Sequence, residues 1–438
     1  MATLADIVRA IDSIGAALSI GSRTVLSLDT NTVPADWGHI TKIDPELEKQ
    51  LPFAYPLYLQ HTSAVSVGGS SGVTGDLTEE TFELLNAARI PSFHEPSAAR
   101  HVTDRTRKQA EFMAVPEVLN GDSEALVGTL GEGIEHVRDD LAPSILGEKL
   151  PIPLGDGLGD RFSAFAAAWL MEESVFEAYI IQNPDSAAAR EANVTESDLL
   201  SPTEARQRAM AAETHLDSEV IYLEYSGTFG GDEAVSLLEA IDDAVNWSRI
   251  WYGGGLDDRD NTERVLAAGA DAVVVGNVFH EIADEEADLA DRALEALGTD
   301  PTREAVEDWV TETVDAADTA AARYLATITD IQDPATRGAR YLAAGVHAVL
   351  QLHGIAAGLD APDAAALREA VAESAPAATA FADALGTDAT DLAADLGLAL
   401  LADRFDVSLD AGAAGENRTG NEDEDDTVFA ARQIGVGI

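Results

Sequence analysis

The 438-residue sequence contains no cysteine, which excludes disulfides, thiolate metal sites and cysteine nucleophiles. Lysine is almost absent as well, since it occurs only as Lys42, Lys49, Lys108 and Lys149. With 79 acidic and 27 basic side chains, the net charge at pH 7 is −52. A chain this negative lacks the basic face that phosphate backbones and anionic membranes require, so we expect no nucleic-acid partner.

The acidic surplus is spread along the chain, and hydrophobic residues make up 46 % of it. That hydrophobic share is enough for a folded core, so the acidity does not indicate disorder. Dispersed carboxylates with scarce lysine suit a cytosol of molar salt, where the Debye length falls to roughly 3 Å. We interpret the composition as adaptation to high salt; the alternative is an ordinary acidic enzyme.

Long apolar runs are also scarce. The N-terminal segment carries Asp6 and Asp12 and is typical of an amphipathic helix rather than a secretory signal. The longest uncharged stretch, Tyr341–Leu359, contains His347, His353 and three glycines, which favours a buried helix over a membrane span. We therefore expect a cytoplasmic protein without a transmembrane segment, while transient contact with a membrane surface stays open.

Short apolar strands alternate with helical patterns between residues 34 and 297. This alternation predicts an α/β fold, a modified (β/α)8 TIM barrel. The unit between the third and fourth strands is irregular, because residues 98–110 have little apolar stripe, so its helix is expected to be short or missing. The expected strands are His39–Pro45, Ser63–Gly69, Pro91–Ser97, Glu111–Glu117, Glu177–Asn183, Val220–Gly227, Arg249–Gly255 and Ala272–Asn277.

Composition sets four further segments apart. Residues 1–33 are expected to form an N-terminal helical extension. Residues 138–160 are rich in Pro and Gly and are expected to be an insertion in the barrel, either a lid or a plain surface loop. Alanine-rich helices over 300–410 predict a separate C-terminal all-α domain, and 411–438 is expected to be an acidic flexible tail.

Active sites of such barrels lie at the C-terminal ends of the strands, so polar residues there are the candidates. In the first strand, HITKIDP, alternation places Lys42 and Asp44 on one face. The two side chains can hold a phosphate and a divalent cation, or form a simple ion pair. The second strand ends in GGSSGVT, where glycines allow a ligand to approach and Ser70 offers a hydroxyl to a metal or phosphate.

The sixth strand, VIYLEYSG, carries a glutamate in its middle. Alternation places Tyr222, Glu224 and Ser226 on one face and Leu223 and Tyr225 on the other. A carboxylate that faces the barrel interior is costly to bury without a purpose. Glu224 is therefore a candidate general base whose pKa is raised by its enclosure; the alternative is a structural glutamate paired with a core cation.

Glycines end the seventh and eighth strands, at Gly254 and Gly255 in WYGGG and at Gly276 before Asn277 in VVVGN. Backbone amides after these two strands form the usual phosphate site of phosphate-handling barrels. No histidine cluster has metal-ligand spacing, no Ser/His/Asp triad is supported, and no Walker or Rossmann loop occurs in the sequence.

The segments TKIDP, VGGSSGVT, EAYIIQNPDSAAA, YLEYSGTFG, YGGGLDD and VVVGN resemble, in this order, the motifs of the geranylgeranylglyceryl phosphate synthase and PcrB family. The likeness covers about residues 35–285. It implies a modified TIM barrel in which a looser segment replaces the third helix. It also implies an enzyme that joins a polyprenyl diphosphate to sn-glycerol 1-phosphate, which makes the first ether bond of archaeal membrane lipids.

The resemblance implies a role for each motif residue. Asp44 and Ser70 would bind the Mg²⁺ that holds the diphosphate, and Glu224 would be the catalytic base that accepts the proton of the attacking glycerol hydroxyl. The residues that would bind glycerol 1-phosphate are Lys42, Tyr222, Leu223, Glu224, Tyr225, Ser226, Gly227, Gly254, Gly255, Gly276 and Asn277.

Four features depart from the family pattern: the N-terminal extension, the insertion, the helical domain and a small residue, Gly133. Members limited to a geranylgeranyl chain have a bulky aromatic near this last place, so Gly133 would admit a longer donor. The alternatives are thus a geranylfarnesyl or heptaprenyl donor, or a barrel retained for binding or assembly.

Two regions have no assigned role. We expect the helical domain to make protein–protein contacts and the protein to be a homo-oligomer. The basic stretch Arg100–Lys108 either meets the diphosphate or is a solvated face.

Overall fold

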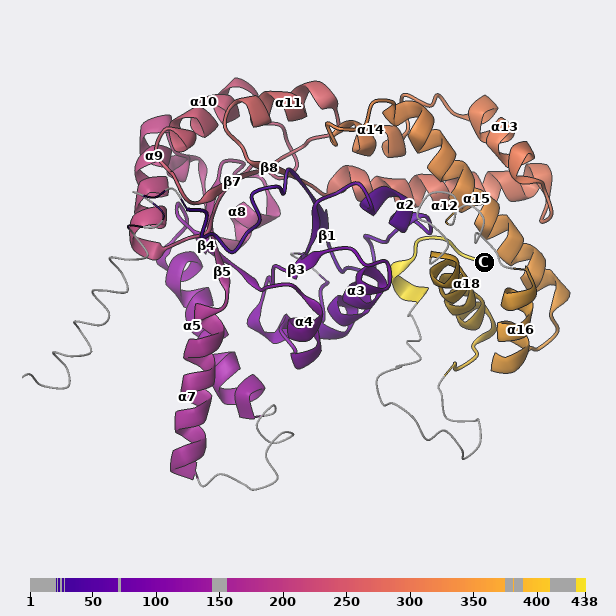
Figure 1. Cartoon of the computed structure of the whole chain (residues 1–438), viewed down its shortest axis with the longest axis horizontal. Helices are drawn as coiled ribbons and strands as arrows, with labels where there is room; N and C mark the ends of the chain where they lie inside the picture. The colour runs from indigo at the N-terminus through magenta and orange to yellow at the C-terminus, as the bar shows by residue number, and fades with distance from the viewer. Residues whose placement is uncertain are drawn as a thin grey trace, which may run out of the picture.

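Eight parallel strands pair in the order β3-β2-β1-β8-β7-β6-β5-β4 (Figure 1). The computed structural model describes residues 21, 23, 26, 28–69, 72–143, 156–374, 381, 389–409 and 431–438. A parallel bridge from His94 to Met113 links the two edge strands, so the sheet curls into a nearly closed barrel. The strands are β1 His39–Ile43, β2 Ala64–Val67, β3 Ser92–His94, β4 Ala114–Val118, β5 Val175–Ile181, β6 Val220–Glu224, β7 Arg249–Gly253 and β8 Ala272–Val275.

All eight strands overlap the stretches expected from the sequence, so the predicted barrel is confirmed. The strands of a parallel barrel are buried on both faces, and β6 is buried at every position. Ile221 and Leu223 of β6 belong to the core cluster formed with the surrounding helices. Tyr222 lies in the cluster that fills the barrel interior with Phe93 and Trp251.

The helices that alternate with the strands cover the outside of the barrel. The one after β3 is short, as predicted: α4 Asp104–Gln109 has only six residues, begins with a capping box at Thr103 and ends before Ala110. The others around the barrel are α2 Tyr55–Leu59, α3 Gly75–Ala87, α8 Ala187–Glu191, α9 Pro202–Ala211, α10 Gly231–Asp242, α11 Arg259–Ala267 and α12 Asn277–Leu297.

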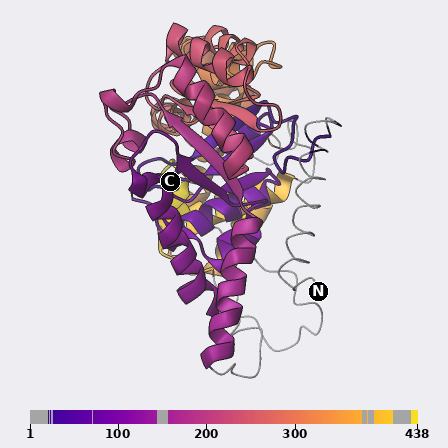
Figure 2. The ribbon, with the colours of Figure 1, turned by 90° about the vertical axis from the view of Figure 1, so that its left-hand side faces the viewer.

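Two helices between β4 and β5 project from the barrel as an arm, which Figures 1 and 2 show from two sides. They are α5 Thr129–His136, which continues through a π-helical turn to Leu141, and α7 Asp156–Glu172. The described ends of the predicted insertion, 138–143 and 156–160, thus lie at the outer part of this arm, and 144–155 is outside the described residues.

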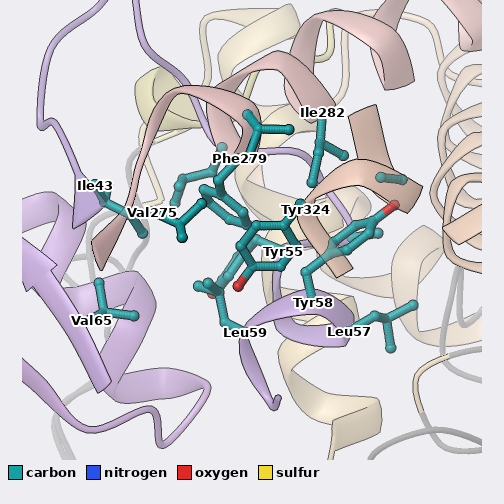
Figure 3. Packing of buried hydrophobic residues seen from close by; sticks show 14 of the residues in the cluster. Ile43, Tyr55, Leu57, Tyr58, Leu59, Val65, Val275, Phe279, Ile282 and Tyr324 are labelled. Atoms are coloured by element: carbon teal, nitrogen blue, oxygen red, sulfur yellow. The ribbon is translucent and has the colours of Figure 1, made fainter. Parts of the chain in front are cut away.

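The chain after the barrel is helical, as predicted. It forms α13 Arg303–Thr313, α14 Ala320–Ala326, α15 Pro334–Gly358, α16 Ala364–Ser374 and α18 Ala389–Phe405. Its apolar side chains do not form a core of their own, however. Tyr324 of α14 packs with Phe279 of α12 and Tyr58 of α2 (Figure 3). One buried cluster runs from the barrel helices to Leu401 of α18. The segment expected to be a separate domain therefore shares the hydrophobic core of the barrel.

The last residues also pack on the body of the protein. Leu51 accepts from the backbone N–H of Gly435 at 2.8 Å and donates to Gln433 at 2.7 Å, and Ile434 and Val436 are buried. Residues 431–438 therefore do not belong to the flexible tail that was expected. Burial of their apolar side chains stabilises the folded position relative to exposure in water. Residues 1–20 and 410–430 lie outside the described part of the chain.

In the described ranges, no helix combines the length and hydropathy needed to cross a lipid bilayer.

Candidate active site

A cavity of about 1070 Å³ opens at the C-terminal ends of the strands. Its wall is built from the residues that follow β1, β2, β3, β6, β7 and β8, together with parts of α5, α7 and α8. This is the face on which barrel enzymes carry their sites. Most of the residues singled out in the sequence line it: Lys42, Asp44, Tyr222, Glu224, Ser226, Gly227, Gly254, Gly255, Gly276 and Asn277.

Lys42 projects from β1 into this cavity and is held by a carboxylate. Its Nζ donates to Oε1 of Glu95 at 2.7 Å, and the same carboxylate accepts from Ser66 Oγ at 2.7 Å and Tyr179 OH at 2.5 Å. Burial opposes the charge of Lys42, but Glu95, Asp44 and Glu224 raise the pKa of Lys42 above its ordinary value. The lysine therefore stays a cation in the middle of the cavity.

Glu95 was not among the residues predicted from the sequence. It directly follows β3, a strand of only three residues, so no alternation pattern drew attention to it. The signal for Glu95 in the sequence is its place at a strand end, which it shares with Asp44 and Glu224.

Glu224 ends β6 and is buried, with 3 % of its surface exposed. Its Oε1 accepts the backbone N–H of Ser226 at 3.1 Å. Burial raises the pKa of Glu224, and Lys42 opposes the rise. A carboxylate with a raised pKa next to a cation can take up a proton from a bound hydroxyl.

Leu223 and Tyr225 do not reach the cavity, although both were expected to bind substrate. Strand alternation turns them to the other face, where both belong to the core cluster around the barrel. Tyr225 OH donates to Oε1 of Glu233 on α10 at 3.3 Å. Their contribution to the site is the packing that fixes β6.

The ends of β7 and β8 form a cradle of backbone. Gly255 has φ +50°, and a Cβ there would lie 2.5 Å from the carbonyl carbon of Thr228, so this position accepts only glycine without strain. Across the cavity wall, Gly276 is the N-cap of the long helix α12, which begins at Asn277. The start of a helix offers free N–H groups and the positive end of its dipole, both of which favour a phosphate.

Asp44 follows β1 and faces the cavity. Its carboxylate pairs with Lys49, and its backbone N–H donates to Nε2 of His280 at 3.2 Å. Ser70, the other expected metal ligand, lies outside the described residues. Among the described residues, no cluster of three or more His, Asp or Glu side chains is arranged to hold a metal by itself.

The wall of the cavity toward the arm is mostly apolar, with His136 as a polar exception. It consists mainly of aliphatic side chains from β4, the arm and α8, and a Cβ placed on Gly133 would have no neighbour within 4 Å. The residues that line this part are Met113, Val115, Pro116, Val118, Ala125, Leu130, Gly133, Val137, Met171, Ala187, Ala188 and Ala192. Such a wall suits a hydrocarbon chain.

The barrel, the glycine cradle and the buried Glu224 occur in the part of the chain that a known family covers. The PcrB family matches residues 33–296. The chain belongs to the PcrB family. The resemblance inferred from the motifs is thereby confirmed, and the residues that follow position 296 lie beyond the family match.

Curated relatives of this PcrB-family chain carry names for two related enzymes. Geranylgeranylglyceryl phosphate synthase of Halobacterium salinarum is 31 % identical over 250 residues, which are 56 % of this chain and 89 % of the relative. The enzyme of the same name from Methanocella arvoryzae is 27 % identical, over 56 % of this chain and 91 % of the relative. Heptaprenylglyceryl phosphate synthase of Bacillus cereus (strain 03BB102) is 27 % identical, with the same two coverages.

Proposed function

We propose that this protein is a prenyltransferase that joins geranylgeranyl diphosphate to sn-glycerol 1-phosphate and forms the first ether bond of archaeal membrane lipids. The observation that carries the proposal is one cavity with three parts. A backbone cradle for a phosphate and a buried carboxylate, Glu224, lie at one end, and an apolar wall leads away toward the arm. The names of the curated relatives support the same reaction.

In this proposal, the phosphate of glycerol 1-phosphate binds to the backbone of Gly254, Gly255, Gly276 and Asn277. These backbone groups carry no net charge, so they bind the phosphate through their N–H groups and through the dipole of α12. Lys42 adds a full positive charge in the same cavity. Ser226 and Gly227, next to Glu224, line the wall where the glycerol hydroxyl would lie.

The diphosphate of the donor would bind near Asp44. Mg²⁺ is often held by one or two protein carboxylates together with substrate phosphates, and Asp44 provides a carboxylate on the cavity wall. The residues present thus fit this ion without a full protein cage. When bound, Mg²⁺ would neutralise charge on the departing diphosphate.

The covalent step forms one carbon–oxygen bond and breaks another. The hydroxyl oxygen of glycerol phosphate attacks the allylic carbon, and the diphosphate leaves with the bonding electron pair. The hydroxyl proton passes to Glu224. The rings of Tyr179 and Tyr222, 4.4 Å apart between their centroids, line the cavity and can stabilise the developing allylic cation by about 0.5–2 kcal/mol.

A longer donor is the second candidate, because of the space at Gly133. The names of the curated relatives include both a geranylgeranyl and a heptaprenyl enzyme, so either chain length is known among them. The open space next to Gly133 would also admit donors longer than geranylgeranyl diphosphate. The homo-oligomer and the cytoplasmic location expected from the sequence stay predictions; light scattering of the intact chain tests the first.

The test is a product assay in molar KCl with Mg²⁺, sn-glycerol 1-phosphate, its enantiomer and a series of prenyl diphosphates. We expect an ether product from sn-glycerol 1-phosphate. The variant Glu224→Gln should keep the fold and lose about 10²–10⁴ in turnover. The matched control is Glu233→Gln, since Glu233 lies outside the cavity on α10.

Folded wild-type protein that yields no product with any donor would support the alternative, a barrel retained for binding or assembly. Near-normal turnover of the Glu224→Gln variant would not contradict the proposed activity and would exclude only the role of Glu224 as the base.

A further inference from the structure

The helical segment that follows the barrel contributes a side chain to the cavity wall. Arg323 lies on α14, outside the part of the chain that the PcrB family matches, yet it lines the same cavity as Gly255 and Asn277. Among the described residues, the other cavity-lining side chains of full positive charge are Lys42 and Lys49, and both belong to the barrel.

Arg323 pairs with one carboxylate on each side of the phosphate cradle. Its Nη1 donates to Asp257 at 3.3 Å, and its Nη2 donates to Glu281 at 2.6 Å. Asp257 lies two residues after Gly255, and Glu281 lies on α12, four residues after Asn277. One guanidinium group thus bridges the loop after β7 and the helix that follows β8.

Several polar contacts fix α14 in this place. Arg259, at the start of α11, donates to the carbonyls of Ile328 and Ile331 at 3.1 and 2.6 Å. Tyr324 OH lies 2.7 Å from Thr41 Oγ1 of β1, and Thr327 Oγ1 lies 2.9 Å from Nε2 of His39. The position of Arg323 is therefore set by the barrel itself and not by a loosely attached helix.

The electrostatics of the cradle give this arginine a function. Asp257 and Glu281 also line the cavity, and two carboxylates next to the cradle would repel an incoming phosphate. A guanidinium with a planar fork can neutralise both at once. The side chain of Arg323 is 35 % exposed and lines the cavity while it holds them.

We propose that Arg323 is a substrate-positioning residue that the helical segment supplies to the glycerol phosphate site. It sets the charge at the rim of the cradle and holds Asp257 away from the bound phosphate. The segment after residue 296 is then a working part of the active site. This inference rests on the proposed function, since it takes the cradle to be the glycerol phosphate site.

A purely structural clamp and a charge-setting residue predict different results. If Arg323 only joined the loop after β7 to α12, its loss and the loss of its partner Glu281 would both weaken the site. If Arg323 sets the charge, removing Arg323 weakens phosphate binding and removing the charge of Glu281 strengthens it. The difference in sign separates the two roles.

The experiment measures two quantities for intact protein. One is the KM for sn-glycerol 1-phosphate at saturating prenyl diphosphate, together with the KM for the donor. The other is the Kd for sn-glycerol 1-phosphate alone, by calorimetric titration without donor. The variants are Arg323→Gln, Glu281→Gln and the control Arg292→Gln, since Arg292 pairs with Asp288 on α12 and does not line the cavity.

We expect Arg323→Gln to raise both the KM and the Kd for glycerol phosphate by about tenfold, because Asp257 and Glu281 would then repel the phosphate without compensation, and we expect no change in the donor KM. Glu281→Gln should lower both values, and Arg292→Gln should match wild type. The effect of Arg323→Gln should shrink as salt rises, because screening weakens charge interactions.

Unchanged glycerol phosphate constants in the Arg323→Gln variant would overturn the inference. A Glu281→Gln variant that binds glycerol phosphate more weakly than wild type would also overturn the inference. This second variant tests the inference even if Arg323→Gln does not fold. Failure of the proposed function has a different signature: wild-type protein binds glycerol phosphate in the titration and forms no ether product.

Discussion

The interior of the barrel near the cavity contains Lys42 together with the carboxyl side chains of Glu95 and Glu177. Glu95 bonds to Lys42, Ser66 and Tyr179, whereas both carboxyl oxygens of the fully buried Glu177 lack a hydrogen-bond partner in the described structure. Burial raises the pKa of Glu177 well above its ordinary value. Since Lys42 donates its hydrogen bond to Glu95, its position depends on Glu95.

We predict that Glu95→Gln lowers kcat/KM by about ten- to hundredfold, since hydrogen bonds to a charged group contribute about 1.5–3 kcal/mol. Lys42 would lose its carboxylate partner and move within the cavity. Steady-state assays with both substrates measure the loss. The control is Glu79→Gln, which removes a surface partner of Arg105. Equal activity of Glu95→Gln and wild type would show that Lys42 is held by other groups.

Alternation along the strands was enough to predict which of several candidate residues face the cavity and which face the core. It put Lys42 and Asp44 on one face of β1, and it separated Tyr222, Glu224 and Ser226 from Leu223 and Tyr225. The assignment of Leu223 and Tyr225 to substrate came from the motif as a block, and the same alternation speaks against it. Arg323 was beyond prediction, because its partners Asp257 and Glu281 lie 66 and 42 residues away in sequence.

Among the elements, helix α5 determines how far the apolar wall of the cavity extends. Gly133 lies on this helix with open space beyond its Cα, and the neighbouring lining residues Leu130 and Val137 come from the same arm. A helix tolerates Trp in place of Gly, since Gly is the weaker helix former. The substitution therefore fills the cavity without breaking the element.

We predict that Gly133→Trp shifts the preferred donor to a shorter prenyl diphosphate and leaves the KM for glycerol phosphate unchanged. Competition between donors of different length, with products identified by mass, measures the shift. Gly131→Trp is the matched control, because Gly131 lies on the same helix and does not line the cavity. If the two variants preferred the same donor, the prenyl chain would have to bind at a place other than the apolar wall beside Gly133.

A second element, α12, joins the barrel to the helical segment through Glu286. Its Oε1 accepts the backbone N–H of Phe53 at 2.5 Å, and Oε2 accepts that of Ala54 at 3.3 Å, at the start of α2. Gly345 of α15 allows the close packing, since a Cβ there would lie 2.0 Å from Oε2. Burial raises the pKa of Glu286 to about 8.

This raised pKa predicts the direction of a pH effect. The folded protein binds the Glu286 proton more tightly than the unfolded chain does, with an unfolded pKa near 4.5. The contribution to stability is therefore full below about pH 4.5 and is lost as pH rises to about 8, by on the order of 1 kcal/mol per unit. Denaturant unfolding at pH 6 and pH 8 measures it.

The variant Glu286→Gln cannot titrate at this position and keeps an acceptor oxygen for Phe53. Its free energy of unfolding should therefore fall less than that of wild type between these two pH values. The same pH dependence in both proteins would assign the effect to other groups.

For the whole molecule, the sequence predicted the order of the elements better than their assembly. Eight strands and a short third helix follow from local patterns of apolar residues and turns. The shared core does not, because alanine-rich amphipathic helices look alike whether they pack on each other or on a barrel. The contacts of Tyr324 with Phe279 and Tyr58 join residues that lie far apart in sequence.

The continuous core has a consequence for unfolding. Tyr55, Tyr58 and Phe279 of the barrel helices are fully buried in the cluster that also contains Leu342 and Val346 of α15. Unfolding the helical segment alone would expose these aromatic side chains, at a cost of about 1.5–3 kcal/mol for each large apolar side chain. Separate unfolding of the two parts is therefore unfavourable.

We predict that the intact chain shows a single cooperative heat-absorption peak, with a calorimetric enthalpy equal to the van't Hoff enthalpy. The variant Leu342→Ala, in the shared core, should lower the midpoint of this one peak and leave it single, because a cavity in the common core weakens both parts together. Scanning calorimetry in molar KCl makes the measurement. Two peaks, of which Leu342→Ala shifts only one, would instead establish the helical segment as an independent domain.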